Sequence, residues 1–125
     1  MNTHESLGNK IFEQATLVEV IEMSIFVLFR VEIKEGKEEE YRKLSAEILK
    51  HAKEQKGLIS MERAKSILKE RTYVSIHEWE SEEAIEKWAN HPRHQEAMRI
   101  GRGELFSWYS VKRMVELPQK GGELF

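Results

Sequence analysis

The sequence predicts one α+β domain whose β-sheet carries its helices on one face. Segments in which apolar and polar residues alternate with period two, typical of strands, are separated by segments whose apolar residues recur at helical spacing. Their order along the chain is strand, helix, strand, strand, helix, strand. The chain has 125 residues, a length that suits one domain.

The first strand is predicted at Met23–Ile33. One face of this segment is apolar throughout, and the opposite face carries two large apolar residues, Phe26 and Leu28, before it turns polar. A strand that is apolar on both faces is usually covered on both sides. We therefore expect both faces of the sheet to be covered.

A helix is predicted from Glu38 to about Gln55. Its apolar residues form one stripe at helical spacing, starting with Tyr41. Glutamates at its start and basic residues at its end complement the helix dipole. Gly57 is a natural stop after such a helix.

Two strands are predicted next, at Leu58–Lys65 and Arg71–Glu80, with a polar connection between them. In the second of these strands, Tyr73, His77 and Trp79 share one face. The other face of this strand is apolar as well, so it has the same two-sided character as the first strand.

The region after these strands is predicted to hold two consecutive helices. Ser81 caps the first of them, and Trp88 lies on its apolar side. Pro92 begins the second, because proline suits a first helical turn, and Gly101 ends it. The last strand is predicted at Phe106–Glu116.

This order of elements is the ferredoxin-like β-α-β-β-α-β arrangement, whose helices cover only one face of the sheet. The strands nevertheless carry large residues on both faces, and an exposed apolar patch of that size is rare on a monomer. We therefore expect a second copy of the chain to cover the bare face. The domain is expected at residues 23–116, between an N-terminal extension at 1–22 and a C-terminal tail at 117–125. The large residues are Phe26, Leu28, Tyr73, Trp79, Trp108 and Met114.

Composition and charge exclude several classes of protein. The net charge of −2 argues against nucleic acid and anionic membranes as partners. The chain has no cysteine, which excludes disulfides, thiolate nucleophiles and cysteine-bound metals. The longest strongly apolar run, Ile25–Phe29, is too short to span a membrane. Because the N-terminus also lacks a secretory signal pattern, we expect a cytoplasmic protein.

Two histidines three residues apart, His91 and His94, stand near the start of the helix that begins at Pro92. Such spacing can hold a metal, but no third ligand is evident beyond Glu96, and HExxH is absent, so no metal is expected. His94 shares a helical face with apolar residues. It is therefore either a hydrogen-bonded core residue or a base or hydrogen-bond donor in a pocket.

The tripeptide Gly101-Arg102-Gly103 lacks the spacing of a phosphate-binding loop. Arg102 is therefore either a solvated residue beside a helix cap or an arginine that stabilises an anionic substrate oxygen. The large aromatic residues nearby are expected mostly in the core, because the glycine-aromatic signature of RNA-binding modules is missing. They are Trp79, Trp88, Trp108 and Tyr109.

Two spaced patterns cover most of this region. The first is W-x-S-x-E-A-I-x-x-W, at Trp79–Trp88, and the second is H-x-x-A-x-x-x-G-R-x-x-x-F-x-x-Y, at His94–Tyr109. Together they resemble the antibiotic biosynthesis monooxygenase (ABM) family of the dimeric α+β barrel superfamily. The likeness extends over about residues 23–116.

The resemblance implies a dimeric α/β barrel, in which the sheets of two subunits pack together, and a pocket between sheet and helices. It also implies a cofactor-independent monooxygenase, which oxidises a small quinol- or anthrone-like aromatic with dioxygen and uses no metal or flavin. Some relatives have no known activity. The alternative is therefore a non-catalytic small-ligand-binding or stress-associated dimer.

The resemblance and the residue types together suggest roles in a site. His94 is the candidate base and Arg102 the partner of the substrate oxyanion. The candidate substrate-binding walls are Trp79, Trp108 and Tyr109.

A haem-degrading branch of the superfamily has an asparagine on the first strand and an iron-ligating histidine after the second tryptophan of the pattern. Those positions fall near Phe29 and on Met98 in this sequence. Because both residues depart from that branch, haem degradation is the least expected of the three functions.

Overall fold

The structure, a computed structural model, describes residues 23–118. The predicted N-terminal extension at 1–22 and residues 119–125 of the predicted tail lie outside the described residues. The elements in chain order are β1 (Ile25–Ile33), α3 (Glu38–Lys53), β2 (Leu58–Lys65), β3 (Thr72–Trp79), α4 (Glu82–Ala89), α5 (Pro92–Ile100), the π-helical turn η1 (Gly101–Leu105) and β4 (Phe106–Met114).

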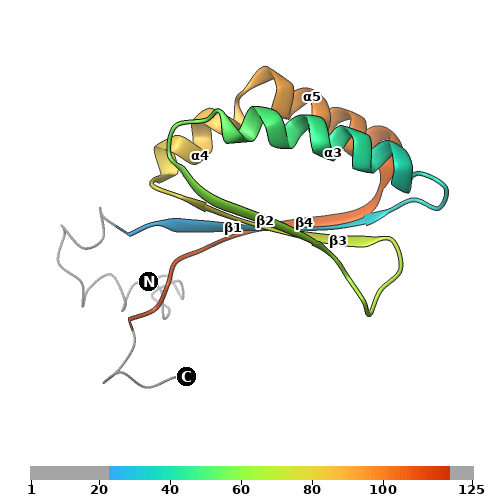
Figure 1. Ribbon diagram of the computed structural model, residues 1–125, viewed down its shortest axis with the longest axis horizontal. Coiled ribbons are helices and arrows are strands. Elements are labelled where there is room, and N and C mark those ends of the chain that lie inside the picture. Colours follow the sequence, from blue (N-terminus) through green and yellow to red (C-terminus); the bar gives the residue numbers. More distant parts are fainter. Residues whose placement is uncertain (1–22, 119–125) are drawn as a thin grey trace, which may run out of the picture.

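The four strands form one antiparallel sheet in the order β2-β3-β1-β4. Figure 1 shows α3, α4 and α5 together on one side of the curved sheet. Among the described residues, no helix or strand covers the other side. The predicted α+β, ferredoxin-like subunit is confirmed. None of the helices of residues 23–118 has the length and apolar character needed to cross a membrane.

The face of the sheet that meets the helices, here called the covered face, holds the core. Val31 and Ile33 of β1 are fully buried, at 0% exposed. Trp79 of β3 is 1% exposed and packs with Trp88 of α4, whose predicted burial is confirmed at 5% exposed. The core therefore forms where the apolar side of each helix meets this face.

The core consists of two separate clusters of buried residues rather than one. The first cluster is Val31, Ile33, Tyr41, Leu105 and Phe106. The second is Ala52, Trp79, Ile85 and Trp88. Both clusters lie between helices and sheet, which leaves space between them for a cavity.

The opposite face, here called the open face, is uncovered by any described element and carries large apolar residues among charged ones. The register places Phe26 opposite Met114 and Leu28 opposite Ile76 on this side. Trp108, 47% exposed, lies here as well. Tyr73 and Trp79 do not contribute to it, because both pack on the covered face.

The local signals around the two short helices behave largely as predicted. The Ser81 hydroxyl accepts a hydrogen bond from the Ala84 N–H, and Pro92 occupies the first turn of α5. The prediction that Gly101 ends the second helix needs a correction, because the chain continues there into the π-helical turn.

Gly101 has a second role in this turn. A Cβ atom at this position would lie 2.3 Å from the ring of Phe106, so glycine is needed for close approach. Its backbone is right-handed, with φ −57°, rather than the left-handed form of a glycine cap. The turn brings Phe106 back under the end of α5.

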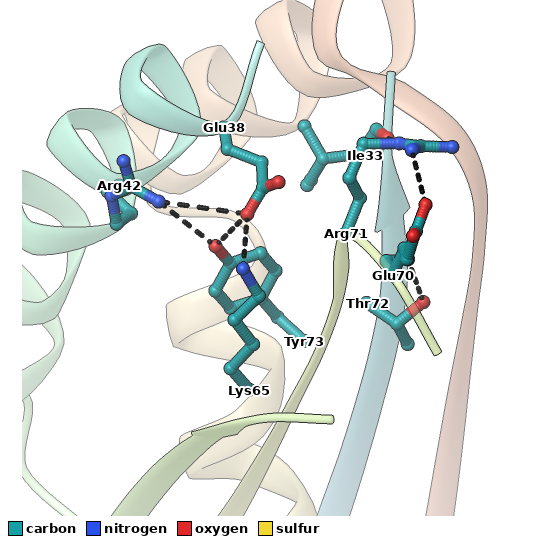
Figure 2. Close-up of polar contacts among 8 residues, drawn as sticks. All are labelled: Ile33, Glu38, Arg42, Lys65, Glu70, Arg71, Thr72 and Tyr73. Carbon is teal, nitrogen blue, oxygen red and sulfur yellow. Dashed lines mark hydrogen bonds and ion pairs between the residues drawn. The ribbon is translucent and has the colours of Figure 1, made fainter. Parts of the chain in front are cut away.

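One end of the helix layer is tied to the sheet by a polar cluster (Figure 2). The Glu38 carboxylate at the start of α3 accepts hydrogen bonds from the Tyr73 hydroxyl at 2.6 Å and the Lys65 ammonium at 2.9 Å. Arg42 donates to the same hydroxyl at 3.3 Å. The hydrogen bonds from Tyr73 and then Lys65 lower the pKa of Glu38. The cluster holds α3 above β2 and β3.

Candidate functional site: a cavity on the covered face

A cavity of about 200 Å³ lies between the covered face and the three helices. Its walls are mostly apolar and include the rings of Phe29, Trp79, Trp88 and Phe106. An apolar cavity of about 150 Å³ is enough to bind benzene. A mostly apolar lining with a few polar groups is typical of small-molecule sites. The cavity therefore suits an aromatic ligand of one or two rings.

Two polar side chains of β3 point into this cavity. Ser75 and His77 are two residues apart and so share a face of the strand. The His77 Nε2 atom lies 3.2 Å from the Ser75 Oγ atom. Burial, assisted by the positive charges of His94 and Arg63, lowers the pKa of His77 from 6.5 to about 4. His77 is therefore a neutral hydrogen-bonding group at neutral pH.

His94 of α5 also lines the cavity, with its ring edge against Trp88 at a centroid distance of 5.1 Å. Burial lowers the pKa of His94, while a hydrogen bond to the backbone of Ala89 raises it in opposition. The charges of His91 and Arg102 lower it further. Because the pKa of His94 is lowered, its ring is neutral at neutral pH, and a neutral imidazole offers one nitrogen as a proton acceptor.

The second histidine of the pair, His91, has a structural task. Its Nδ1 atom accepts a hydrogen bond of 3.1 Å from the Arg93 N–H and so caps α5. Over residues 23–118, no group of three or more histidine, cysteine, aspartate or glutamate residues is arranged to hold a metal ion. The pair therefore divides into a cap, His91, and a cavity residue, His94.

Two arginines stand in the cavity wall. Arg113 of β4 donates to the Glu86 carboxylate of α4 at 2.9 Å. Arg63 of β2 donates to the Ser45 hydroxyl of α3. Both side chains therefore bridge a strand to a helix beside the cavity.

The structure brings two of the five predicted site residues to this cavity. Trp79 and His94 line it. Tyr109 lies beside it, against Phe29 and Phe106 at centroid distances of 6.3 and 5.7 Å, without lining it.

The other two predicted residues lie elsewhere. Arg102 is exposed in the π-helical turn and reaches the site only through its charge, which lowers the pKa of His94. Trp108 lies on the open face under the Arg30 guanidinium, at 5.6 Å from the ring centroid. Trp108 therefore cannot be a wall of this cavity within one subunit.

Sequence reasoning missed Ser75, His77 and Arg63 as site residues. A signal was present, because His77 was predicted to share a face with Trp79, and period two extends this face to Ser75. The pattern could not tell which residue of β2 lies beside Ser75 and His77. The register supplies this residue, since Arg63 pairs with Ser75.

Comparison with known protein families decides the kinship of the chain. The sequence model described as antibiotic biosynthesis monooxygenase matches residues 24–100. The chain belongs to the antibiotic biosynthesis monooxygenase family. The match contains β1 to α5, and so most of the elements that enclose the cavity. No curated protein sequence matches the chain.

Solved structures share the fold of this ABM-family chain. A protein from Shewanella oneidensis superposes with a TM-score of 0.72 at 18% identity, covering 76% of this chain and 92% of its own. SnoaB from Streptomyces nogalater, described as a cofactor-independent oxygenase, has a TM-score of 0.67 at 17% identity, covering 81% of this chain and 99% of its own. A Mycobacterium tuberculosis protein has a TM-score of 0.69 at 17% identity, covering 78% and 98%. At such identities the likeness shows a common fold.

Proposed function

We propose that this protein is a monooxygenase that oxidises a small electron-rich aromatic, quinol- or anthrone-like, with dioxygen and without a metal or flavin. The observation that carries the proposal is the apolar cavity of about 200 Å³, lined by aromatic rings and by His77 and His94. Membership of the ABM family supports it, as does the fold shared with the oxygenase SnoaB.

The chemistry explains why such a cavity would suffice. Triplet dioxygen reacts slowly with neutral organic molecules but accepts an electron from an electron-rich anion. A base must therefore form the phenolate or enolate, and apolar walls must keep it from water. With a quinol, one oxygen atom enters the ring and the other leaves as water with two substrate hydrogens, which gives a hydroxyquinone. The substrate itself supplies all the electrons that dioxygen takes up.

His94 is the candidate base in this scheme. It lines the cavity, and its lowered pKa keeps the ring neutral, so that one nitrogen can accept the substrate proton. His77 is a weaker base, with a pKa of about 4, and is better suited to hydrogen-bond the substrate together with Ser75. Trp79 and Trp88 would form the walls. Arg102 would act only through its charge.

The test is dioxygen consumption with reduced 1,4-naphthoquinol. His94→Ala should slow the enzymatic rate by roughly 10²–10⁴-fold, the usual range for a general base. The matched control is His51→Ala, because His51 on α3 does not line the cavity. An unchanged rate in the His94 variant would refute its role.

A wild-type rate no faster than spontaneous autoxidation would refute the catalytic proposal. Binding of the quinol without turnover would then favour the alternative, a ligand-binding or stress-associated protein of the same fold. Haem degradation is disfavoured by the cavity itself. Phe29 and Met98, at the positions of the haem branch's asparagine and histidine, both line it.

We also propose that the protein is a homodimer in which the open faces of two copies pack together. Support comes from Trp108 and Ile76, which are 47% and 42% exposed on the open face, a face that no described element covers. Sedimentation equilibrium at micromolar concentration should give the mass of two chains, and a stable folded monomer would overturn the idea. A cytoplasmic location remains a prediction of the cysteine-free sequence.

A further inference from the structure

Apart from one tyrosine, the ionisable side chains that line the cavity are all basic. Two arginines and two histidines line it, and among residues 23–118 its lining includes no aspartate or glutamate. Arg113 is neutralised by its ion pair with Glu86 at 2.9 Å. Arg63 has a hydroxyl partner, Ser45, and no carboxylate partner within the described part of the chain. The cavity therefore has one uncompensated permanent cation at its edge.

The sheet register directs Arg63 toward the cavity. Arg63 pairs with Ser75 and Met61 pairs with His77, so all four side chains lie on the covered face. Arg63, His77 and Tyr41 all line the cavity. Burial lowers the pKa of His77 and raises that of Tyr41, and the charge of Arg63 adds to the first shift and opposes the second. Ser45 holds the guanidinium from the helix side. Arg63 is thus positioned at the exposed edge of the cavity, beside Ser75 and His77.

We propose that the ligand of this cavity is an aromatic acid, whose carboxylate pairs with Arg63 at the cavity edge while its ring enters the apolar interior. A guanidinium is the side chain best suited to bind a carboxylate in two parallel hydrogen bonds. The inference rests on the proposed function for the existence of an aromatic ligand and adds the charge of that ligand. Arg63 is a specificity-determining residue in this account and takes no part in the chemistry of oxidation.

The experiment compares two ligands of the same shape, 2-naphthoate and 2-naphthamide, by isothermal titration calorimetry at pH 7.5. The wild type should bind the carboxylate about 10- to 100-fold more tightly than the amide, the range for a hydrogen bond to a charged group. In Arg63→Gln this preference should disappear, while binding of the amide is retained. Arg63→Lys should keep part of the preference, since it keeps the charge but loses the two-pronged geometry.

Arg113→Gln is the matched control, because it removes an arginine of the same cavity whose charge is already paired. It should leave the preference intact. Equal wild-type affinity for the two ligands would overturn the inference and leave the proposed function standing. Loss of the preference in Arg113→Gln, with its retention in Arg63→Gln, would overturn the assignment to Arg63. Failure of both ligands to bind the wild type would overturn the proposed aromatic site itself, and the inference with it.

Discussion

Both faces of the sheet carry large apolar side chains, but only one of them is covered by helices. On the covered face, Trp79 and Ile33 are almost fully buried, and two packed clusters leave a cavity between them. On the open face, Trp108 and Ile76 remain about half exposed although they are equally apolar. Successive side chains of a strand point to opposite faces, so apolar residues at consecutive positions put apolar side chains on both faces. Only the helices decide which face is closed.

The difference teaches where to look for each kind of function. A cavity costs stability, because its lining atoms lack contacts that a filled core would provide. A cavity between two well-packed clusters is therefore a feature with a use, and we assign the ligand to it. An uncovered surface with exposed large apolar residues suits a second protein surface, and the proposed partner subunit is assigned to the open face.

The largest expected effect comes from replacing the tryptophan that packs against the covered face, compared with the tryptophan of the open face. Trp88→Ala should lower the free energy of unfolding by about 3–5 kcal/mol, since it removes a ring that is 5% exposed. Trp108→Ala should instead weaken association of the chains and leave the unfolding of each subunit nearly unchanged. Urea denaturation over a range of protein concentrations separates the two effects. A loss below about 1 kcal/mol for Trp88→Ala would contradict its place in the core.

The next effect is a loss of stability at acidic pH, which arises from His77 on the covered face. The pKa of His77 is about 4 in the folded protein, whereas an ordinary histidine has a pKa of 6.5, so the unfolded chain takes up a proton first as the pH falls. Above pH 6.5 the ring is neutral in both states and contributes nothing. Between pH 6.5 and 4 stability should fall by about 3 kcal/mol in total, of which about 2 kcal/mol is lost by pH 5.

The measurement is urea denaturation of the wild type and His77→Gln at pH 7.5 and pH 5. The variant should lose less stability than the wild type between these two values, by about 2 kcal/mol. The comparison between proteins is needed because His94, whose pKa is also lowered, adds to the same trend in both. Identical pH dependence of the two proteins would show that His77 is not buried.

A smaller effect tests how tightly the covered face is packed next to its cavity. Gly101→Ala should cost about 1–3 kcal/mol through overpacking, because the new methyl would meet the Phe106 ring. Gly103→Ala is the matched control two residues on, where a Cβ meets no atom within 4 Å. Thermal unfolding of the two variants should differ in this direction. Equal stability would show that Phe106 moves freely aside.

Much of the fold was predictable from local patterns. The period-two segments located β2 at its observed bounds, Leu58–Lys65, and the other strands within one or two residues at each end. Ser81 and Pro92 marked two helix starts because capping and proline chemistry act within one turn. The π-helical turn was not predictable. The sequence does not distinguish a glycine that ends a helix from a glycine that makes room for an aromatic ring, as Gly101 does for Phe106.

The site was less predictable, because a cavity is defined by elements far apart in the chain. His94 was identified from its residue type and the family resemblance, because its apolar helix face alone also fitted a core residue. The prediction that Trp108 and Tyr109 both line one site was inconsistent with strand geometry, because neighbouring residues of a strand point to opposite faces. Arg63 and His77 needed the β2–β3 register, which no local pattern states.

The most direct test of the two-face account is the affinity of the protein for 2-naphthol, measured by calorimetry in a pair of matched variants. Ala89→Leu fills the cavity from α4, whereas Ala64→Leu adds the same atoms to the open side of β2, opposite Val74. We predict that Ala89→Leu weakens binding by about tenfold or more, equivalent to about 1.4 kcal/mol. Ala64→Leu should stay within about 0.5 kcal/mol of the wild type. Full binding by Ala89→Leu, or loss of binding in Ala64→Leu alone, would contradict the assignment of the ligand to the covered face.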